Sequence, residues 1–280
     1  MAIEPRGFAW RSVPLRVSTL SRAQPLAPEF DVQFSFHDQR ITVNMPTRAA
    51  LEAEVTRRLS AREGFALATI NLDHLVKLRA SSAFARAYAA QDFVVADGWP
   101  IVTLSRLAQR PVELMPGSDM LLPLCQWAAA TGAKVGLLGS TAETLARAKS
   151  VLEARVPGLA VAYTHAPPMG FEPAGDAAAS ELQRLQAAGI GLCLLALGAP
   201  KQEELAARGR DLAPGVGFAS IGAGLDFLAG RQHRAPALAR RLRLEWLWRA
   251  LSSPRRLIPR YARCLAILPG EMIKALRLRG

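Results

Sequence analysis

Apolar runs and helical stretches alternate along the chain from about residue 47 onward. The apolar runs are residues 65–70, 92–96, 134–139, 159–163, 190–198 and 216–224. Each run is uniformly apolar rather than alternating, which is typical of strands buried on both faces of a sheet. Strands that alternate with helices form parallel sheets with right-handed crossovers. The pattern therefore predicts an α/β protein with an open, mainly parallel sheet and helices on both faces.

Helical periodicity fills the segments between these runs. We expect helices over residues 71–90, from Trp99 onward, and over residues 117–132, 140–156, 176–189 and 201–212. Ser118 or Asp119 is the expected N-cap of the third helix, and Ser140 or Thr141 that of the fourth. Ahead of the sheet, residues 32–45 predict an antiparallel β-hairpin that turns at His37 and Asp38.

The last fifty residues predict helices with basic faces, broken at Pro254 and Pro269. Trp and Leu recur there at a helical spacing, as in Leu238, Leu242 and Trp246. Basic amphipathic helices of this kind suit an anionic membrane surface. Helices packed on the body with their arginines in solvent fit the pattern equally well.

The excess positive charge is confined to the same segment. The formal net charge is +12, but residues 231–280 hold 13 Arg or Lys against two Glu, and residues 1–230 hold 22 against 21. The basic segment therefore points to an anionic partner, which could be a membrane surface, a phosphate or a nucleic acid. We divide the chain into a flexible extension (1–34), an α/β body (35–230) and a basic helical appendage (231–280).

Composition favours a folded protein of a reducing, cytoplasmic compartment. Half of the 280 residues are hydrophobic, so a sizeable core is available. No signal peptide is apparent, and the longest apolar run, residues 187–199, is too short to span a bilayer. Cys125, Cys193 and Cys264 are widely spaced, which fits neither a disulfide framework nor a zinc site.

The carboxyl ends of the predicted strands gather the residues that could carry chemistry. Ligands of open α/β sheets bind at this edge, where glycines admit a ligand to the backbone and helix N-termini favour anions. The strand ends deliver, in chain order, Thr69, Asn71 and Asp73; Asp97 and Gly98; Gly139, Ser140 and Thr141; Thr164 and His165; Gly198, Pro200, Lys201, Gln202 and Glu203; and Gly222, Gly224 and Asp226.

Several chemistries lack their sequence signatures. The chain has no G-x-x-x-x-G-K-[ST] phosphate loop, no G-x-G-x-x-G fingerprint and no G-x-S-x-G elbow. The four histidines lack metal-ligand spacing, and there is no D-x-D pair to hold Mg²⁺.

Single residues at this edge also have plain structural interpretations. Asp97 could be a helix cap, because Asp is common before a helix. Asn71 could be an ordinary turn residue, and Lys201 and Glu203 could be surface residues at a helix start.

Six segments in this order resemble one family. They are TINLDH (69–74), VVADGWPIV (94–102), PGSDM (116–120), LGAPKQEE (197–204), IGAGLDFLAGRQHRAP (221–236) and LEWLWRALSSPRRLIPRY (244–261). Together they resemble the WecG/TagA/CpsF family of bacterial glycosyltransferases (glycosyltransferase family 26) over about residues 35–268. Trp99 departs from the family, in which small or aliphatic residues are usual at this position.

The resemblance implies an inverting hexosyltransferase that uses a UDP-sugar. The acceptor implied is a sugar on polyprenyl diphosphate at the cytoplasmic face of the cell membrane, in cell-surface polysaccharide synthesis. The donor sugar implied is of the N-acetylmannosamine type or another hexose. The implied fold is a Rossmann-like body with a basic C-terminal appendage that touches an anionic membrane, and the protein could form homo-oligomers in solution.

The resemblance also assigns roles to residues. Asp97 is the expected base, Thr69 and Asn71 are expected to position a substrate, and Gln202 is expected to contact the sugar or its phosphates. The other residues expected at the substrates are Gly98, Gly139, Gly198, Pro200, Lys201, Glu203, Gly222, Gly224 and Asp226, with Arg249, Arg256 and Arg260 from the appendage. Arginines are expected to stabilise the leaving UDP without a metal cofactor.

Two other classes of function remain as alternatives. A nucleic-acid-binding protein would explain the basic segment, but the body is neutral and no known module is present. A nucleotide-dependent oxidoreductase could share the fold, but it would need the missing glycine fingerprint.

Overall fold

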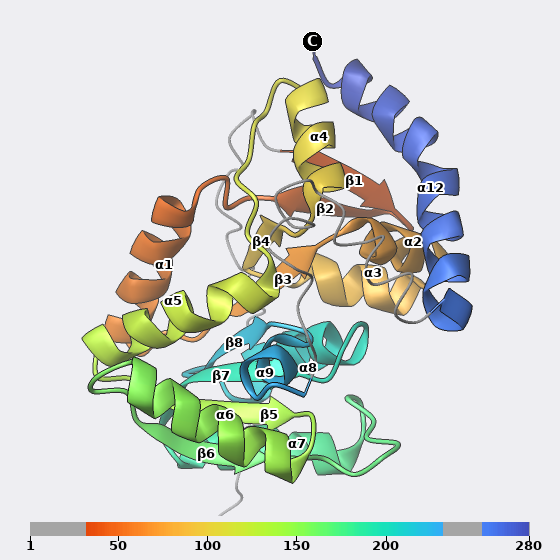
Figure 1. Cartoon of the computed structure of the whole chain (residues 1–280). Coiled ribbons are helices and arrows are strands. Elements are labelled where there is room, and N and C mark those ends of the chain that lie inside the picture. The colour runs from red at the N-terminus through yellow and green to blue at the C-terminus, as the bar shows by residue number, and fades with distance from the viewer. Residues whose placement is uncertain (1–31, 232–253, 280) are drawn as a thin grey trace, which may run out of the picture.

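The computed structural model describes residues 32–231 and 254–279 (Figure 1). The extension expected at residues 1–34 therefore lies almost wholly outside the described residues, and so do Arg249 and the repeat of Leu238, Leu242 and Trp246. The division of the chain into three parts stays a prediction.

A six-stranded parallel sheet forms the centre of the body, as predicted. Its strands are β3 (Ala66–Ile70), β4 (Phe93–Ala96), β5 (Lys134–Gly139), β6 (Val161–His165), β7 (Ile190–Ala196) and β8 (Gly217–Ser220). The spatial order is β4-β3-β8-β7-β5-β6, so the first and last strands of the sheet pair with each other. The α/β fold class is confirmed.

Helices cover both faces of this sheet. They are α1 (Arg48–Ser60), α2 (Leu72–Ala80), α3 (Ser82–Ala89), α4 (Trp99–Leu107), α5 (Gly117–Ala130), α6 (Ala142–Arg155), α7 (Asp176–Ala187), α8 (Lys201–Leu212) and α9 (Gly224–Leu228). Helices α1, α5 and α6 share one core with Leu67, Val135 and Leu192 of the strands. Helices α7 and α8 pack on the other face, against Leu195 and Phe218.

The predicted β-hairpin is present and consists of β1 (Val32–Phe36) and β2 (Gln39–Val43). His37 and Asp38 turn the chain with φ of 48° and 61°, the left-handed conformation that a two-residue hairpin loop needs. Phe34 and Ile41 bury the hairpin in a third core, together with α2, α3 and α4.

Three local predictions were wrong. The helix expected over residues 71–90 is two helices, because Ser81 is extended and its hydroxyl caps α3 by accepting from Phe84 N. Pro116, not Ser118 or Asp119, is the N-cap of α5. Helix α12 (Pro254–Arg277) begins at Pro254 but continues through Pro269. Pro269 withdraws a donor from the carbonyl of Leu265, which lies on the exposed side of α12 where water can replace it.

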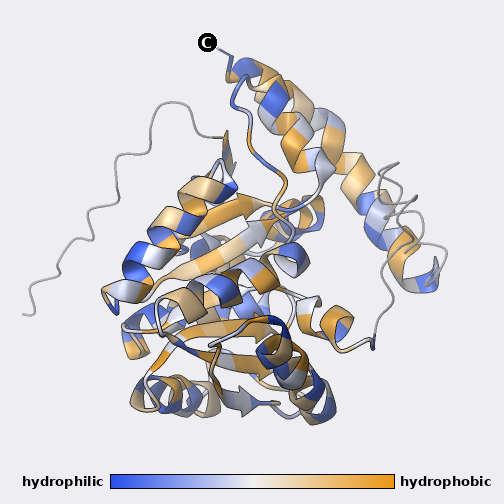
Figure 2. Ribbon diagram, turned by 60° about the vertical axis from the view of Figure 1, so that its left-hand side comes forward, coloured by the Kyte–Doolittle hydropathy of each residue, from blue (hydrophilic) through white to orange (hydrophobic). Residues whose placement is uncertain are grey.

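Helix α12 packs along α2 and α4 on the outside of the body (Figure 1). Its inner face buries Cys264 and Ala275, and its buried Glu271 pairs with Arg79 of α2. Its outer face leaves Ile258, Leu265, Met272, Ile273 and Leu276 exposed, so apolar and charged residues mix along its length (Figure 2). Helix α12 is thus packed on the body with basic residues in solvent, which is one of the two expectations, and its contact with a membrane stays a prediction.

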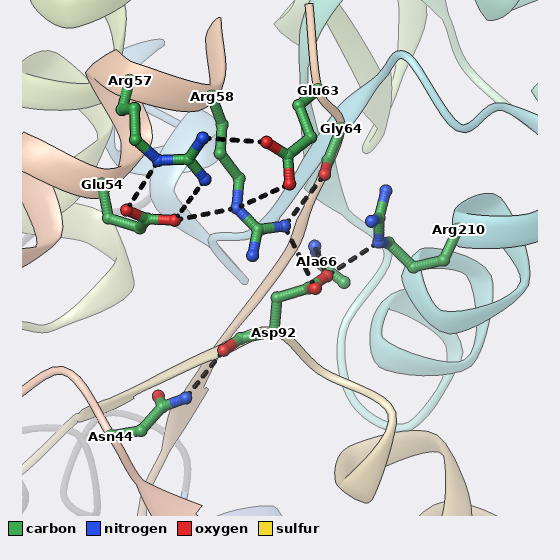
Figure 3. Close-up of polar contacts among 9 residues, drawn as sticks. All are labelled: Asn44, Glu54, Arg57, Arg58, Glu63, Gly64, Ala66, Asp92 and Arg210. Carbon is green, nitrogen blue, oxygen red and sulfur yellow. Dashed lines mark hydrogen bonds and ion pairs between the residues drawn. The ribbon is translucent and has the colours of Figure 1, made fainter. Parts of the chain in front are cut away.

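A charged cluster joins α1, β4 and α8 at the amino ends of the strands (Figure 3). The Asp92 carboxylate accepts from Ala66 N (2.9 Å) and pairs with Arg58 (3.1 Å) and Arg210 (2.7 Å). Asp92, Arg58 and Arg210 are only 10–17 % exposed. The cluster lies at the edge opposite to the strand ends that carry the candidate chemistry, so we assign it to stability.

Candidate active site

The topology predicts a ligand crevice at the carboxyl ends of β5 and β7. Helix α6 follows β5 on one face of the sheet, and α8 follows β7 on the other, so the connections of these neighbouring strands diverge. Open α/β sheets bind ligands at such a switch point. Gly139 ends β5 with φ of 120°, and a Cβ there would lie 2.4 Å from the carbonyl oxygen of Ala196. Only glycine lets the two strand ends approach this closely.

Asp97 follows β4 and is hydrogen-bonded to the neighbouring strand end. Asn71 Nδ2 donates to Asp97 Oδ2 over 3.1 Å, and Asp97 N donates to Ile70 O over 2.7 Å. Asp97 is not a helix cap, because Gly98 is the N-cap residue of α4 and no side chain caps that helix. Asp97 is half-buried, so part of the residue is open to solvent.

Asn71 has two structural tasks. Its Oδ1 accepts from His74 N as the N-cap of α2, while its amide nitrogen holds Asp97. A turn residue would need only the first bond. The second fixes the orientation of the carboxylate, as a partner of a catalytic acid or base should.

A buried network supports this corner from below. Tyr88 hydroxyl donates to Thr69 O (2.7 Å) and lies 3.0 Å from His74 Nδ1. Burial lowers the pKa of His74 to about 4, so the imidazole is neutral near pH 7. Thr69 itself is buried in β3, two residues before Asn71.

Gln202 joins the loop after β7 to the loop after β8. Its Oε1 accepts from Gly198 N (3.2 Å) and Gly222 N (3.3 Å), and its Nε2 donates to Glu203 Oε1 (2.8 Å). Gln202 is 2 % exposed, so these bonds occupy it with protein groups. Its observed role is to brace two glycine loops, and its contact with a sugar or phosphate stays a prediction.

Glu203 is fully buried behind Gln202 in the first turn of α8. Burial raises the pKa of Glu203 to about 7, although the hydrogen bond from Gln202 opposes this effect. Its backbone carbonyl accepts from Gln91. Glu203 is therefore neither a surface residue nor exposed to a substrate in this arrangement.

Asp226 reaches the crevice from α9. Ser140 Oγ donates to Asp226 Oδ1 (2.7 Å), and Arg231 donates to Thr141 Oγ1 (3.1 Å). Beside them is a cavity of about 490 Å³ lined by Thr141, Ala142, Glu143, Thr144, Arg147, Ala229 and Arg231. Two guanidinium groups and the N-terminus of α6 thus border one cavity, a combination that suits an anion.

The remaining predicted site residues are dispersed. Lys201 is held by the loop after β6, because its Nζ donates to Phe171 O and pairs with Glu172. Pro200 is the N-cap residue of α8, and Gly224 packs on Leu121 of α5. Arg260 pairs with Asp73 over 2.9 Å. Arg256 belongs to α12, but its side chain, like Arg249, lies outside the described part of the chain.

Lys77 was not among the predicted site residues. Its Nζ pairs with Asp73 (3.0 Å) and donates to Ala199 O (3.1 Å). Asp73 and Lys77 are four residues apart on α2, so the sequence could have suggested their ion pair. Its contact with Ala199, 122 residues away in the chain, has no signal in the sequence.

A second cavity, of about 380 Å³, lies beside α4. Trp99, Val102, Arg106, Pro111, Val112, Glu113, Leu114, Pro46 and Thr47 line it. Trp99 faces this cavity, with the Arg106 guanidinium 5.9 Å from its ring centre. Neither cavity is lined by Asp97.

Within residues 32–231 and 254–279, no three His, Cys, Asp or Glu side chains gather as metal ligands. In the same part of the chain, every helix is too short or too polar to cross a membrane.

One family of known proteins matches the chain. The sequence model described as the glycosyl transferase WecG/TagA/CpsF family matches residues 37–279. The match begins after β1 and covers β2, the whole six-stranded sheet and α12, and thus every strand end described above.

Proposed function

Because the chain belongs to the WecG/TagA/CpsF family of glycosyl transferases, we propose that it moves a hexose from a UDP-sugar to a lipid-linked acceptor with inversion. The acceptor proposed is a sugar on polyprenyl diphosphate, in the synthesis of a cell-surface polysaccharide. Family membership favours this transferase over an oxidoreductase or a nucleic-acid-binding protein.

The Asp97–Asn71 pair is the observation that carries the mechanism. Asp97 takes the proton from the acceptor hydroxyl as the oxygen attacks the anomeric carbon of the donor. The new glycosidic bond forms while the bond from that carbon to the UDP oxygen breaks, and attack from the opposite face inverts the configuration. Asn71 holds the carboxylate in the orientation that this transfer needs.

The donor is proposed to lie across the strand ends from β5 to β4. Asp226, beside Ser140, can accept hydrogen bonds from ribose hydroxyls, as acidic residues of nucleotide-binding α/β folds do. The Cβ positions of Gly198 and Gly222 face open space, so a diphosphate could approach the loops after β7 and β8 closely. Gln202 holds the loops after β7 and β8 together through its bonds to Gly198 N and Gly222 N.

The leaving diphosphate gains negative charge, which arginines can stabilise through charge-assisted hydrogen bonds. Arg260 lies beside α2, where it pairs with Asp73, and we propose that it acts on the diphosphate together with Arg249 and Arg256 of the appendage. No metal cofactor is proposed for this step.

The appendage is proposed to rest on the inner face of the cytoplasmic membrane. Arg255, Arg263 and Lys274 accompany the exposed apolar residues of α12, and basic residues beside buried apolar ones bind anionic lipid. The enzyme would then meet its lipid-linked acceptor at the membrane surface.

Asp97→Asn is the test of this function. The variant keeps the size of the side chain but cannot take a proton, so we expect turnover to fall about 10²- to 10⁴-fold. UDP binding, measured by calorimetry, should stay within about twofold, because Asp97 acts on the acceptor. The wild-type protein is offered a panel of UDP-sugars together with a polyprenyl-diphosphate acceptor. The mass of the product then identifies the sugar that is transferred. Full activity of the variant would disprove the assignment of the base.

A further inference from the structure

Helix α2 contacts three parts of the candidate site within its first two turns. Asn71 caps it and holds Asp97, and Asp73 in its first turn pairs with Arg260 of α12. One turn later, Lys77 donates to Ala199 O in the loop between β7 and α8. The base, the appendage and the donor loop therefore meet on one short helix.

Asp73 is the centre of this arrangement. Its Oδ1 lies 2.9 Å from Arg260 Nε and its Oδ2 lies 3.0 Å from Lys77 Nζ, and the side chain is 12 % exposed. Burial by itself would raise the pKa of Asp73, but Arg260 and Lys77 outweigh it and the pKa lies below its ordinary value. The carboxylate is thus ionised and shared between the two cations.

Lys77 transmits this arrangement to the donor loop. Its ammonium has an acceptor on each side, Asp73 at 3.0 Å and Ala199 O at 3.1 Å. Gly198 in the same loop is held from the other side by Gln202. A shift of α12 that moves Arg260 changes the charge around the Asp73 carboxylate. Because Lys77 pairs with the same carboxylate, its position and its hydrogen bond to Ala199 O then change as well.

We propose that Asp73 and Lys77 are positioning residues that couple the docking of α12 to the loop of residues 197–200, and so to the affinity for the nucleoside diphosphate donor. This inference rests on the proposed function. It gives the appendage an effect on donor binding that does not require its arginines to touch the donor. Docking of the appendage by the membrane would then raise the affinity for the donor without a direct contact between the two.

The first experiment compares Lys77→Met with Lys77→Arg in the full chain. We expect Lys77→Met to bind UDP roughly threefold to thirtyfold more weakly, to raise the donor KM in proportion, and to leave the acceptor KM unchanged. Lys77→Arg keeps the charge and should recover most of the affinity. Lys149→Met is the matched control, because Lys149, like Lys77, pairs with a carboxylate one turn away, here Glu153, and donates to a backbone carbonyl, that of Val161. It should leave UDP affinity unchanged.

A double-mutant cycle separates coupling from a local effect. Glu271→Gln loosens α12 at Arg79, at the other end of α2, and should weaken UDP binding in the wild-type background. In the Lys77→Met background, the same change should have little further effect. Additive effects, or unchanged UDP affinity in Lys77→Met, would overturn the inference. If the wild-type protein itself binds no UDP, the proposed function fails instead.

Discussion

Removal of the Asp92 carboxylate should destabilise the body without affecting the site. In Asp92→Asn, Arg58 and Arg210 lose the anion between them, and an amide group faces two guanidiniums (Figure 3). Breaking one side of a fully buried ion pair costs about 3–5 kcal/mol. Since these side chains are 10–17 % exposed, solvent screens part of the effect, and we expect a loss of about 2–4 kcal/mol in unfolding free energy.

The assay is urea unfolding at pH 7, with thermal unfolding beside it. In a domain of this size, each kcal/mol shifts Tm by about 2–4 °C, so the expected fall is roughly 4–16 °C. UDP affinity should be unchanged, because the extended chain from Asp92 to Asp97 puts roughly 16 Å between the cluster and the base.

Arg57→Met is the matched control within the same cluster. Arg57 pairs with Glu54 and Glu63 but is half exposed, and exposed ion pairs contribute little to stability. We expect no measurable shift of its unfolding midpoint. A loss below about 1 kcal/mol in Asp92→Asn, or an equal loss in both variants, would refute the assignment of the stabilising charge to Asp92.

Three further outcomes are expected. The pKa of Glu203 is raised to about 7 from its usual 4.5, so its stabilising contribution is complete below pH 4.5 and is lost as the pH rises through 7, by about 3 kcal/mol at most. Glu203→Gln should remove this pH dependence from the unfolding free energy, and identical pH profiles of the two proteins would contradict it. Leu265→Gln, at a side chain 60 % exposed on α12, should weaken co-sedimentation with anionic-lipid vesicles roughly tenfold. Met169→Gln, at a fully exposed residue outside α12, should leave this co-sedimentation unchanged. Equal binding of the vesicles by both variants and the wild type would show that the outer face of α12 does not bind the membrane. A chelator should leave the rate of sugar transfer unchanged. Strong inhibition that Mg²⁺ reverses would show that arginines alone do not stabilise the leaving diphosphate.

The sequence predicted the elements of the fold well because most strands of the sheet are nearly continuous apolar runs, although the edge strand β6 alternates between buried and more exposed residues. The run at 92–96 ends in Asp97, and parallel strands deliver their carboxyl ends to one edge, so the placement of this acid beside Asn71 was foreseeable. The residues that the family resemblance singled out lie mainly at this edge. The order of the strands was not foreseeable, because nothing local states that β3 pairs with β8.

Contacts between distant segments account for what was missed. Ser140 and Asp226 are 86 residues apart, and each alone has an ordinary interpretation as a residue near a helix start. The end of α2 at Ser81 was hidden, because the apolar positions of α2 and α3 keep a helical spacing across it. Gln202 was predicted at the substrate from its motif, but its bonds to two loop glycines depend on the pairing of β7 with β8.

The strand order also limits the kind of donor that can use the whole edge. From β5, where Ser140 meets Asp226, to β4, where Asp97 lies, the order crosses β7, β8 and β3, which at the usual strand separation is about 19 Å. A ligand that reaches both ends must span this length, and a nucleoside diphosphate sugar bound as proposed, with its ribose at β5 and its anomeric carbon near Asp97, meets this requirement. β4 is the edge strand of the sheet, and α4, which follows it, packs against α12. We expect the acceptor to reach Asp97 from this side. The exposed apolar face of α12 lies on this side, so a membrane held there would present its lipid-linked acceptor to the base.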